Sequence, residues 1–343
     1  MRSYLKTYIL SLNVLSPTFI GSGQSINKKE YIFLPNQKKA IIPSLHKMYS
    51  YLAEKGHAKA FENYLLNEST DLHSFLRRVG ITEKEYSIFG EYSVLTGNAV
   101  FDDRSKKEIN LFVKDAYGKP YIPGSSIKGA IRTILLGNEV IENPQKYGIA
   151  KQEMQNEQFK GKKSYMSRPI KSIENKAFST LPYEKSNNAA NDRLRGLRFG
   201  DSNPISTDNL VLCQKIDIST KGKEKPINTL RECIKPGTVV EFPLTIDSDI
   251  FEQSAEDIIK GVDTFNMNYR KCFLNEFSNN QSYGSNVIYL GGGAGYATKT
   301  VLYPLFGKVD GLKQVARIMR NTTPPNHHHE KDEEIGASPH MKK

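Results

Sequence analysis

The sequence predicts an α+β protein with a ferredoxin-like core that carries large helical and loop insertions. The expected core elements follow the order strand, helix, strand, strand, helix, strand, which is the ferredoxin-like order. Long segments of different composition separate these elements along the 343 residues. We therefore expect a single domain over residues 1–320, with insertions at 44–120, 138–195 and 219–234, followed by a polar tail at 321–343.

The first strand and the first helix have the clearest patterns. Residues 4–15 alternate between apolar and polar side chains over most of their length, which predicts a strand with one buried face. An apolar stripe at helical spacing runs from Ile127 to Leu135, and Gly137 is expected to end that helix.

The rest of the chain supplies the other core elements. A long amphipathic helix is predicted from Ile258 to Phe273, and a glycine-rich turn with a final strand over 290–304. Pro243 places its strand at a sheet edge or a bulge, because proline lacks the N–H that a central strand needs. The other strand signals lie at Leu197–Gly200, Leu210–Ile218 and Val239–Ile246.

Residues 44–90 have the pattern of a helical insertion that lies outside the sheet core. One apolar face begins at Leu45 and ends before Gly56, and a second runs from Leu72 to Val79. Thr82 and Glu85 have the spacing of a capping box, which predicts the start of a third short helix.

The chain is basic, with a formal net charge of +11. Residues 160–198 contain ten Lys and Arg against three acidic residues, and Arg193, Arg195 and Arg198 close this segment. Such a segment is either an anion-binding loop or an ordinary solvated loop. The overall charge favours a polyanionic partner, and weak periodicity over 138–195 predicts partial disorder without a ligand.

The cysteines and the apolar runs bear on the compartment. Cys213, Cys233 and Cys272 are odd in number and far apart, so neither a disulfide framework nor a zinc motif is indicated. This usage fits a reducing cytosol. The sequence has no signal-peptide core and no apolar run of about 18 residues. A cytoplasmic protein without a membrane partner is expected.

The segment from Pro123 to Arg132 has the pattern of a phosphate contact. Gly124, Ser125 and Ser126 open a helix, where backbone N–H groups lack partners within the helix and favour an anion. Lys128 and Arg132 are four residues apart and therefore share one face of that helix. The ordinary alternative is a serine cap followed by two solvated charges.

A second candidate is the loop from Leu290 to Thr300. Gly291, Gly292, Gly293 and Gly295 cost backbone entropy, so they suit a loop whose amides approach a ligand or another backbone. Lys299 follows directly. The loop is neither a P-loop nor a dinucleotide fingerprint, and a tight turn is the competing interpretation.

Four blocks in this order resemble the RAMP (repeat-associated mysterious protein) superfamily of type III CRISPR effector complexes. The third block is similar to a thumb hairpin that leads into a strand. The blocks are the N-terminal strand running into Phe19–Gly23, Tyr121–Gly129, Lys215–Asp217 through Arg231–Thr238, and the late glycine loop.

Within this superfamily the chain is most similar to the single-copy Csm-type subunit that caps the crRNA 3′ end in type III-A complexes. This similarity is carried by Arg231–Thr238, Leu290–Gly293, Lys299-Thr300 and the tail ending at His340. It implies a modified RNA-recognition fold and a subunit that binds single-stranded crRNA and takes part in crRNA maturation. The implied partners are other Csm subunits, especially the backbone RAMP subunit, and host nucleases.

The resemblance has one departure. The glycine loop lacks the Arg that backbone-type relatives often carry between its glycines. Its amides and Lys299 would therefore have to contact phosphate.

Catalysis has one weak candidate pair. Asp102 and Asp103 are adjacent, and backbone-type relatives cut target RNA with a loop aspartate and a metal, so a metal-dependent endoribonuclease is the alternative function. The same residues also suit a hairpin turn. His327–His329 beside acidic residues could bind a divalent metal, although a polar tail is the simpler interpretation. We expect that the protein is not an enzyme and that it holds neither a cofactor nor a resident metal.

Overall fold

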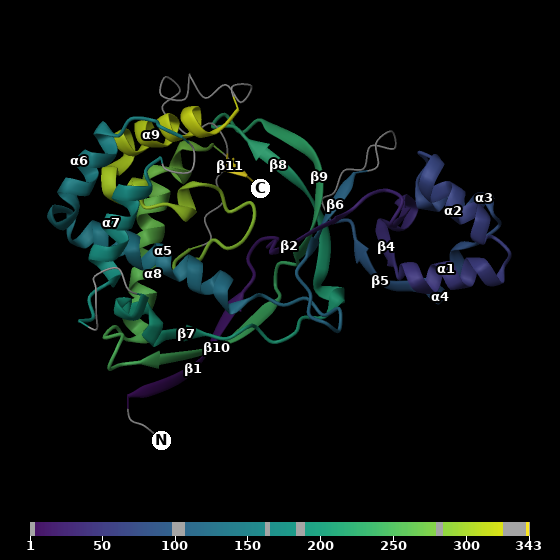
Figure 1. The fold of residues 1–343 in the computed structure, drawn as a ribbon, viewed down its shortest axis with the longest axis horizontal. Coiled ribbons are helices and arrows are strands. Elements are labelled where there is room, and N and C mark those ends of the chain that lie inside the picture. The colour runs from purple at the N-terminus through teal and green to yellow at the C-terminus, as the bar shows by residue number, and fades with distance from the viewer. Residues whose placement is uncertain are drawn as a thin grey trace.

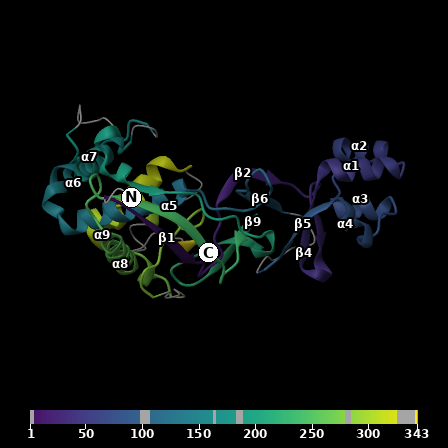
Figure 2. The same cartoon turned by 90° about the horizontal axis from the view of Figure 1, so that it is seen from below.

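The computed structural model describes residues 4–97, 107–161, 165–182, 189–278, 284–324 and 341–342. A smaller sheet and most of the longer helices lie at one end of the molecule, and a larger sheet crosses its middle (Figure 1). A helical lobe lies at the far end of the larger sheet, and the view from below shows it projecting away from the rest (Figure 2). None of the helices in the described ranges is long and apolar enough to span a bilayer.

The smaller sheet has the order β1-β10-β7, and both pairings are antiparallel. Its strands are β1 (Leu5–Asn13), β7 (Leu197–Phe199) and β10 (Val239–Asp247). β1 alternates as predicted: Tyr8 and Leu10 pack on the core, whereas Ile9 is 65% exposed.

The prediction that Pro243 marks a sheet edge or a bulge is wrong. β10 is the central strand of this sheet, and Pro243 pairs with Ile9. The Pro243 carbonyl accepts a hydrogen bond from the Gly200 N–H, just beyond the end of β7. In an antiparallel strand the N and C=O of one residue face the same neighbour. The missing N–H therefore faces the side where β7 ends, and the ladder to β1 stays complete.

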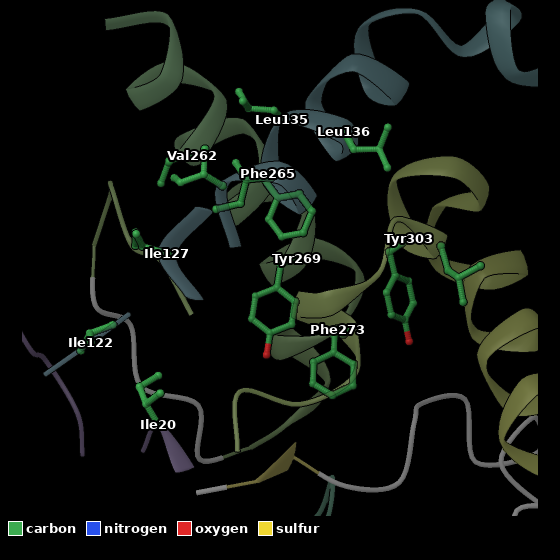
Figure 3. Close-up of a cluster of buried hydrophobic side chains, with 14 of the residues drawn as sticks. Ile20, Ile122, Ile127, Leu135, Leu136, Val262, Phe265, Tyr269, Phe273 and Tyr303 are labelled. Atoms are coloured by element: carbon green, nitrogen blue, oxygen red, sulfur yellow. The ribbon is translucent and has the colours of Figure 1, made fainter. Parts of the chain in front are cut away.

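Three long helices pack against one another beside the smaller sheet. They are α5 (Gly124–Glu142), α8 (Ala255–Cys272) and α9 (Leu302–Thr322). Figure 3 shows Phe265 and Tyr269 of α8 between side chains of α5 and Tyr303 of α9. The predicted end of the first helix at Gly137 is wrong. A Cβ at Gly137 would lie 2.5 Å from the Phe265 ring, so this glycine lets α8 approach the middle of α5.

The larger sheet has the order β2-β6-β9-β8-β5-β4-β3, with β11 also paired to β8. β8 and β9 form a long antiparallel hairpin that pairs Leu210 with Ile234 and Ile218 with Glu224. This confirms the predicted strand Leu210–Ile218 and the hairpin in the third block. The strands are β2 (Gly21–Ile26), β3 (Ile32–Leu34), β4 (Lys39–Pro43), β5 (Gly90–Leu95), β6 (Glu108–Phe112), β8 (Leu210–Ile218), β9 (Glu224–Ile234) and β11 (Met341–Lys342).

The helical lobe has its own apolar core. Its helices are α1 (Leu45–Glu54), α2 (Ala58–Asn67), α3 (Leu72–Arg78) and α4 (Tyr86–Phe89). They enclose Phe61, Tyr64 and Phe75, which are separate from the main core. The capping box at Thr82 and Glu85 is confirmed. The segment 44–120 also contains β5 and β6, so it contributes strands to the larger sheet as well as helices.

Two further predictions differ from the structure. The expected final strand within 290–304 is wrong: a short 3₁₀ helix (Ala297–Lys299) leads into α9. The smaller sheet therefore has three strands within the described residues and lacks the fourth strand of a complete ferredoxin-like core. The basic segment contains α7 (Ser167–Phe178), which follows α6 (Gly148–Asn156). α7 buries Pro169, Ile173, Ala177 and Phe178, so this part of 138–195 has regular structure. The partial disorder expected for 138–195 without a ligand stays a prediction.

Candidate nucleic-acid interface

The start of α5 is held tightly against the chain that follows β7. The Gly124 N–H donates to Asp201 Oδ1 at 2.8 Å. A Cβ at Gly124 would lie 2.4 Å from the Phe199 carbonyl oxygen and 2.5 Å from that of Gly200. This glycine is therefore required for close packing, and its amide already has an anionic partner. Of the three residues predicted to contact phosphate at this helix start, Gly124 is buried, Ser126 is partly buried and Ser125 is exposed.

Arg132 is engaged within the protein. Its Nη1 lies 2.7 Å from Asp192 Oδ2, and its Nη2 lies 3.6 Å from Glu174 Oε2. The guanidinium also stacks on the buried Phe178 ring, with 4.6 Å to the ring centroid. Arg193 approaches the same ring at 5.9 Å. Arg132 therefore joins α5 to α7 and to the 3₁₀ turn that begins at Arg193.

Lys128 lies one turn before Arg132 and is only partly exposed. Burial lowers the pKa of its ammonium, the carboxylate of Asp192 opposes that shift, and the cations of Arg132 and Arg198 add to it. Four groups from α5, the 3₁₀ turn and β7 thus act on one another electrostatically. The structure brings together predicted residues that are up to 70 positions apart in the chain.

The two exposed arginines complete a surface that we call the basic cluster, made of Lys128, Arg195 and Arg198. Arg195 and Arg198 are both exposed. Arg198 Nη2 lies 3.3 Å from Asp247 Oδ2, which orients the side chain beside the sheet. Arg195 is joined to this pair through its backbone, because Arg198 Nε donates to the Arg195 carbonyl at 3.4 Å. Cations that lie this close along the chain are suited to contact consecutive phosphates of a single strand.

The glycine loop packs against the segment that leads into β2. The Gly292 N–H donates to the Phe19 carbonyl at 2.8 Å. Gly291 has φ +79°, and a Cβ there would lie 2.1 Å from the same carbonyl oxygen. Gly291 and Gly292 thus allow two segments of the protein's own backbone to meet. At these two positions the glycines therefore approach another backbone, which is one of the two partners that the sequence predicted for the loop.

The far side of the loop is more open. Gly295 has φ +84°, and a Cβ there would meet no atom within 4 Å. Lys299 is exposed at the end of the 3₁₀ helix, and this short helix contacts α5. Gly295 and Lys299 therefore remain candidates for contact with RNA, whereas a Cβ at Gly293 would lie 3.2 Å from Arg231 Nη1.

Arg231 is a candidate that the sequence did not single out. Its Nη1 donates to the Gly292 carbonyl at 3.2 Å, and its guanidinium stacks on Phe19 at 4.9 Å. It therefore connects β9 to the glycine loop. Arg231 lies in the third block of the family resemblance, but nothing in the sequence of that block indicates which of its side chains would reach the loop.

The sequence also offered candidate metal-binding and catalytic residues. Asp102, Asp103 and His327–His329 lie outside the described residues. Within the described part of the chain, no cluster of three or more His, Cys, Asp or Glu side chains could hold a metal ion. The three cysteines are free thiols.

The sequence and the fold are those of a known class of protein. The RAMP superfamily matches residues 11–293, which is most of the chain. The chain therefore belongs to the RAMP superfamily.

The curated relatives point to one member of that class. The Csm5 protein of the CRISPR system of Streptococcus thermophilus is 34% identical over 335 residues, which cover 92% of this chain and 84% of the relative. Csm5 of Enterococcus italicus is 27% identical over 351 residues, covering 92% of this chain and 85% of the relative. Csm5 of Mycobacterium tuberculosis is 26% identical, covering 90% of this chain and 89% of the relative.

Solved structures share the fold. A chain in the cryo-EM structure of a type III-A Csm–crRNA–target RNA ternary complex has a TM-score of 0.63 and 20% identity, covering 89% of this chain and 90% of that one. The crystal structure of T. onnurineus Csm5 gives the same TM-score at 18% identity, covering 97% of this chain and 99% of that one.

Proposed function

We propose that this protein is a crRNA-binding structural subunit of a type III-A CRISPR ribonucleoprotein, that it caps the 3′ end of the guide, and that it takes part in crRNA maturation. Its partners are the other Csm subunits, in particular the backbone RAMP subunit, and host nucleases. Similarity to Csm5 proteins over nine-tenths of the chain supports the assembly. The basic cluster carries the proposal for RNA, because it gathers cations from separate segments beside α5.

The test of RNA binding is a salt titration of the purified full chain with a labelled single-stranded RNA of about ten nucleotides. Changing Lys128 and Arg195 to Ala should lower the slope of log affinity against log salt by about 1.4, at about 0.7 for each phosphate contact on a single strand. The matched control changes Lys47 and Lys59, which are exposed on the helical lobe and carry the same total charge. Equal slopes for the two variants would contradict the proposal.

The proposed capping and maturation of crRNA are tested in the protein's own host. Complexes purified with this subunit should contain crRNA with uniform 3′ ends, and complexes lacking it should contain longer guides with ragged ends.

The alternative nuclease function is tested by incubating the purified chain and RNA with Mg²⁺. Cleavage that Asp102→Ala and Asp103→Ala together abolish would favour an endoribonuclease.

A further inference from the structure

A half-open pocket of about 250 Å³ lies between β5 and the chain segment that follows β6. Ile42 of β4 and Leu111 of β6 supply apolar surface to it. Glu91, Tyr117 and Lys119 supply polar and aromatic groups. It thus combines an apolar wall, a carboxylate, a cation and an aromatic ring, and it is separate from the basic cluster.

Tyr117 is an exposed aromatic ring on a rigid turn. Its side chain is 89% exposed. Asp115 Oδ1 accepts hydrogen bonds from the N–H groups of Tyr117 at 2.9 Å and Lys119 at 2.8 Å. The Asp115 N–H donates to the Lys119 carbonyl, and Gly118, with φ +74°, donates back to Asp115. The turn is therefore fixed from inside, while it presents a large apolar surface to solvent.

One wall of the pocket is held in place by a buried ion pair. Lys114 Nζ lies 2.6 Å from Oε2 of the fully buried Glu232, and it donates to the Tyr92 hydroxyl at 2.9 Å. The Tyr92 hydroxyl donates to the other oxygen of Glu232 at 2.6 Å. An ammonium has three N–H donors, so one donor of Lys114 remains for a group inside the pocket that it lines.

The pocket lies close to the start of α5. Lys119 and Gly124 are five residues apart, which an extended chain spans in at most about 18 Å. A strand of RNA that contacts the start of α5 can therefore reach Tyr117 with a base that lies a few nucleotides away. Proteins that hold single strands pair cationic surfaces with aromatic rings on which unpaired bases stack.

We propose that this pocket holds one unpaired nucleobase of the bound RNA, stacked on Tyr117. Glu91 accepts from an exocyclic amino group of that base, since a carboxylate only accepts hydrogen bonds. The site therefore prefers guanine, cytosine or adenine over uracil. The inference rests on the proposed function and adds base recognition to it.

The experiment is an abasic scan on the full-length chain. Affinity is measured for a labelled single-stranded RNA of about ten nucleotides and for the same RNA with each base removed in turn. For the native chain, one abasic position should weaken binding about 5- to 150-fold, which corresponds to about 1–3 kcal/mol for one stacked base. Tyr117→Ala should lose the same factor on intact RNA and give a flat scan. Tyr117→Phe should behave like the native chain.

Two further variants sharpen the test. Tyr49→Ala removes an exposed tyrosine of the helical lobe, and it should change neither the affinity for intact RNA nor the abasic scan. Glu91→Gln should remove the preference against uracil at the sensitive position. A flat scan for the native chain, or a Tyr117→Ala variant that binds intact RNA normally, would overturn the pocket while RNA binding itself stands.

Two other outcomes are distinguishable. If the native chain binds no RNA at any salt concentration, the proposed function has failed rather than the pocket alone. If Tyr117→Ala binds RNA normally but loses subunits that co-purify with the native chain, the turn is a protein contact and the base-binding proposal is wrong.

Discussion

Lys128 and Arg132 carry the same charge on the same helix, yet the structure gives them different roles. Arg132 is paired with Asp192 and stacked on Phe178, and its removal leaves that carboxylate without its partner. We expect Arg132→Ala to lower the free energy of unfolding by about 1–3 kcal/mol, because it removes hydrogen bonds to a charged group. We expect Lys128→Ala to leave stability within about 0.5 kcal/mol and to weaken RNA binding.

The measurement is urea denaturation and RNA affinity on the same preparations. Arg132→Lys is the conservative control, because it keeps the charge but cannot make the planar stack on Phe178. Should Arg132→Ala retain full stability and lose RNA affinity, Arg132 would be a direct contact, as the sequence pattern alone suggested.

The separation of these roles shows the limit of sequence reasoning about a site. The residue types and the helical spacing can be recognised in the sequence, so all of the candidates on α5 lie where their helix was predicted. The residues that hydrogen-bond to these candidates cannot be recognised in this way. Asp201, which accepts from Gly124, and Asp192, which pairs with Arg132, are 60 or more residues away from them in sequence. Only the folded chain shows which charges are already used.

At the level of elements, the glycine loop contains two kinds of glycine. Gly291 approaches the Phe19 carbonyl, whereas Gly295 faces open space, and both have positive φ. Gly295→Ala should cost about 1–2 kcal/mol from the left-handed backbone alone. Gly291→Ala carries the same strain plus a backbone clash, and should cost more.

Melting temperature and RNA affinity, measured on the same variant, distinguish a loop that only reverses the chain from a loop that contacts RNA. If the open side of the loop approaches RNA, Gly295→Ala lowers affinity in a protein that remains folded at the assay temperature. Normal affinity in that variant would make the whole loop a turn and would leave RNA binding to the basic cluster.

Elements with local patterns were predictable, and elements defined by distant partners were not. β8 and α8 follow directly from their alternation and their helical stripe. The strand order is different in kind, because β6 pairs in parallel with β9 across more than 100 residues. The strand predicted within 290–304 is wrong for a related reason. A short apolar run does not distinguish a strand from a helix, and in the folded chain the apolar residues at the end of this run belong to the start of α9.

Over the whole molecule, β4 separates two cores. Its side chains alternate, so Ala40 and Ile42 pack into the main core, whereas Ile41 packs into the core of the helical lobe. The strands on this side join the rest of the larger sheet through a short parallel contact at Leu95 and Val211. Few backbone bonds therefore couple the lobe to the surface that we propose for RNA.

This arrangement predicts that the lobe can unfold while RNA binding persists. Phe75 is fully buried and stacks on Tyr64, with 4.4 Å between ring centroids. Phe75→Ala should cost about 3–5 kcal/mol, as for other buried aromatic residues changed to alanine. Amide hydrogen exchange should then accelerate across α1–α4 and stay slow in β8 and α8. The salt slope of RNA binding, which reports the basic cluster on α5 and the segment 195–198, should stay that of the native chain. Phe242→Ala, an equally buried phenylalanine in β10, is the matched variant in the main core and should reduce RNA affinity along with stability. Equal loss of RNA binding in both variants would show that the contact between β5 and β8 couples the two cores into one cooperative unit.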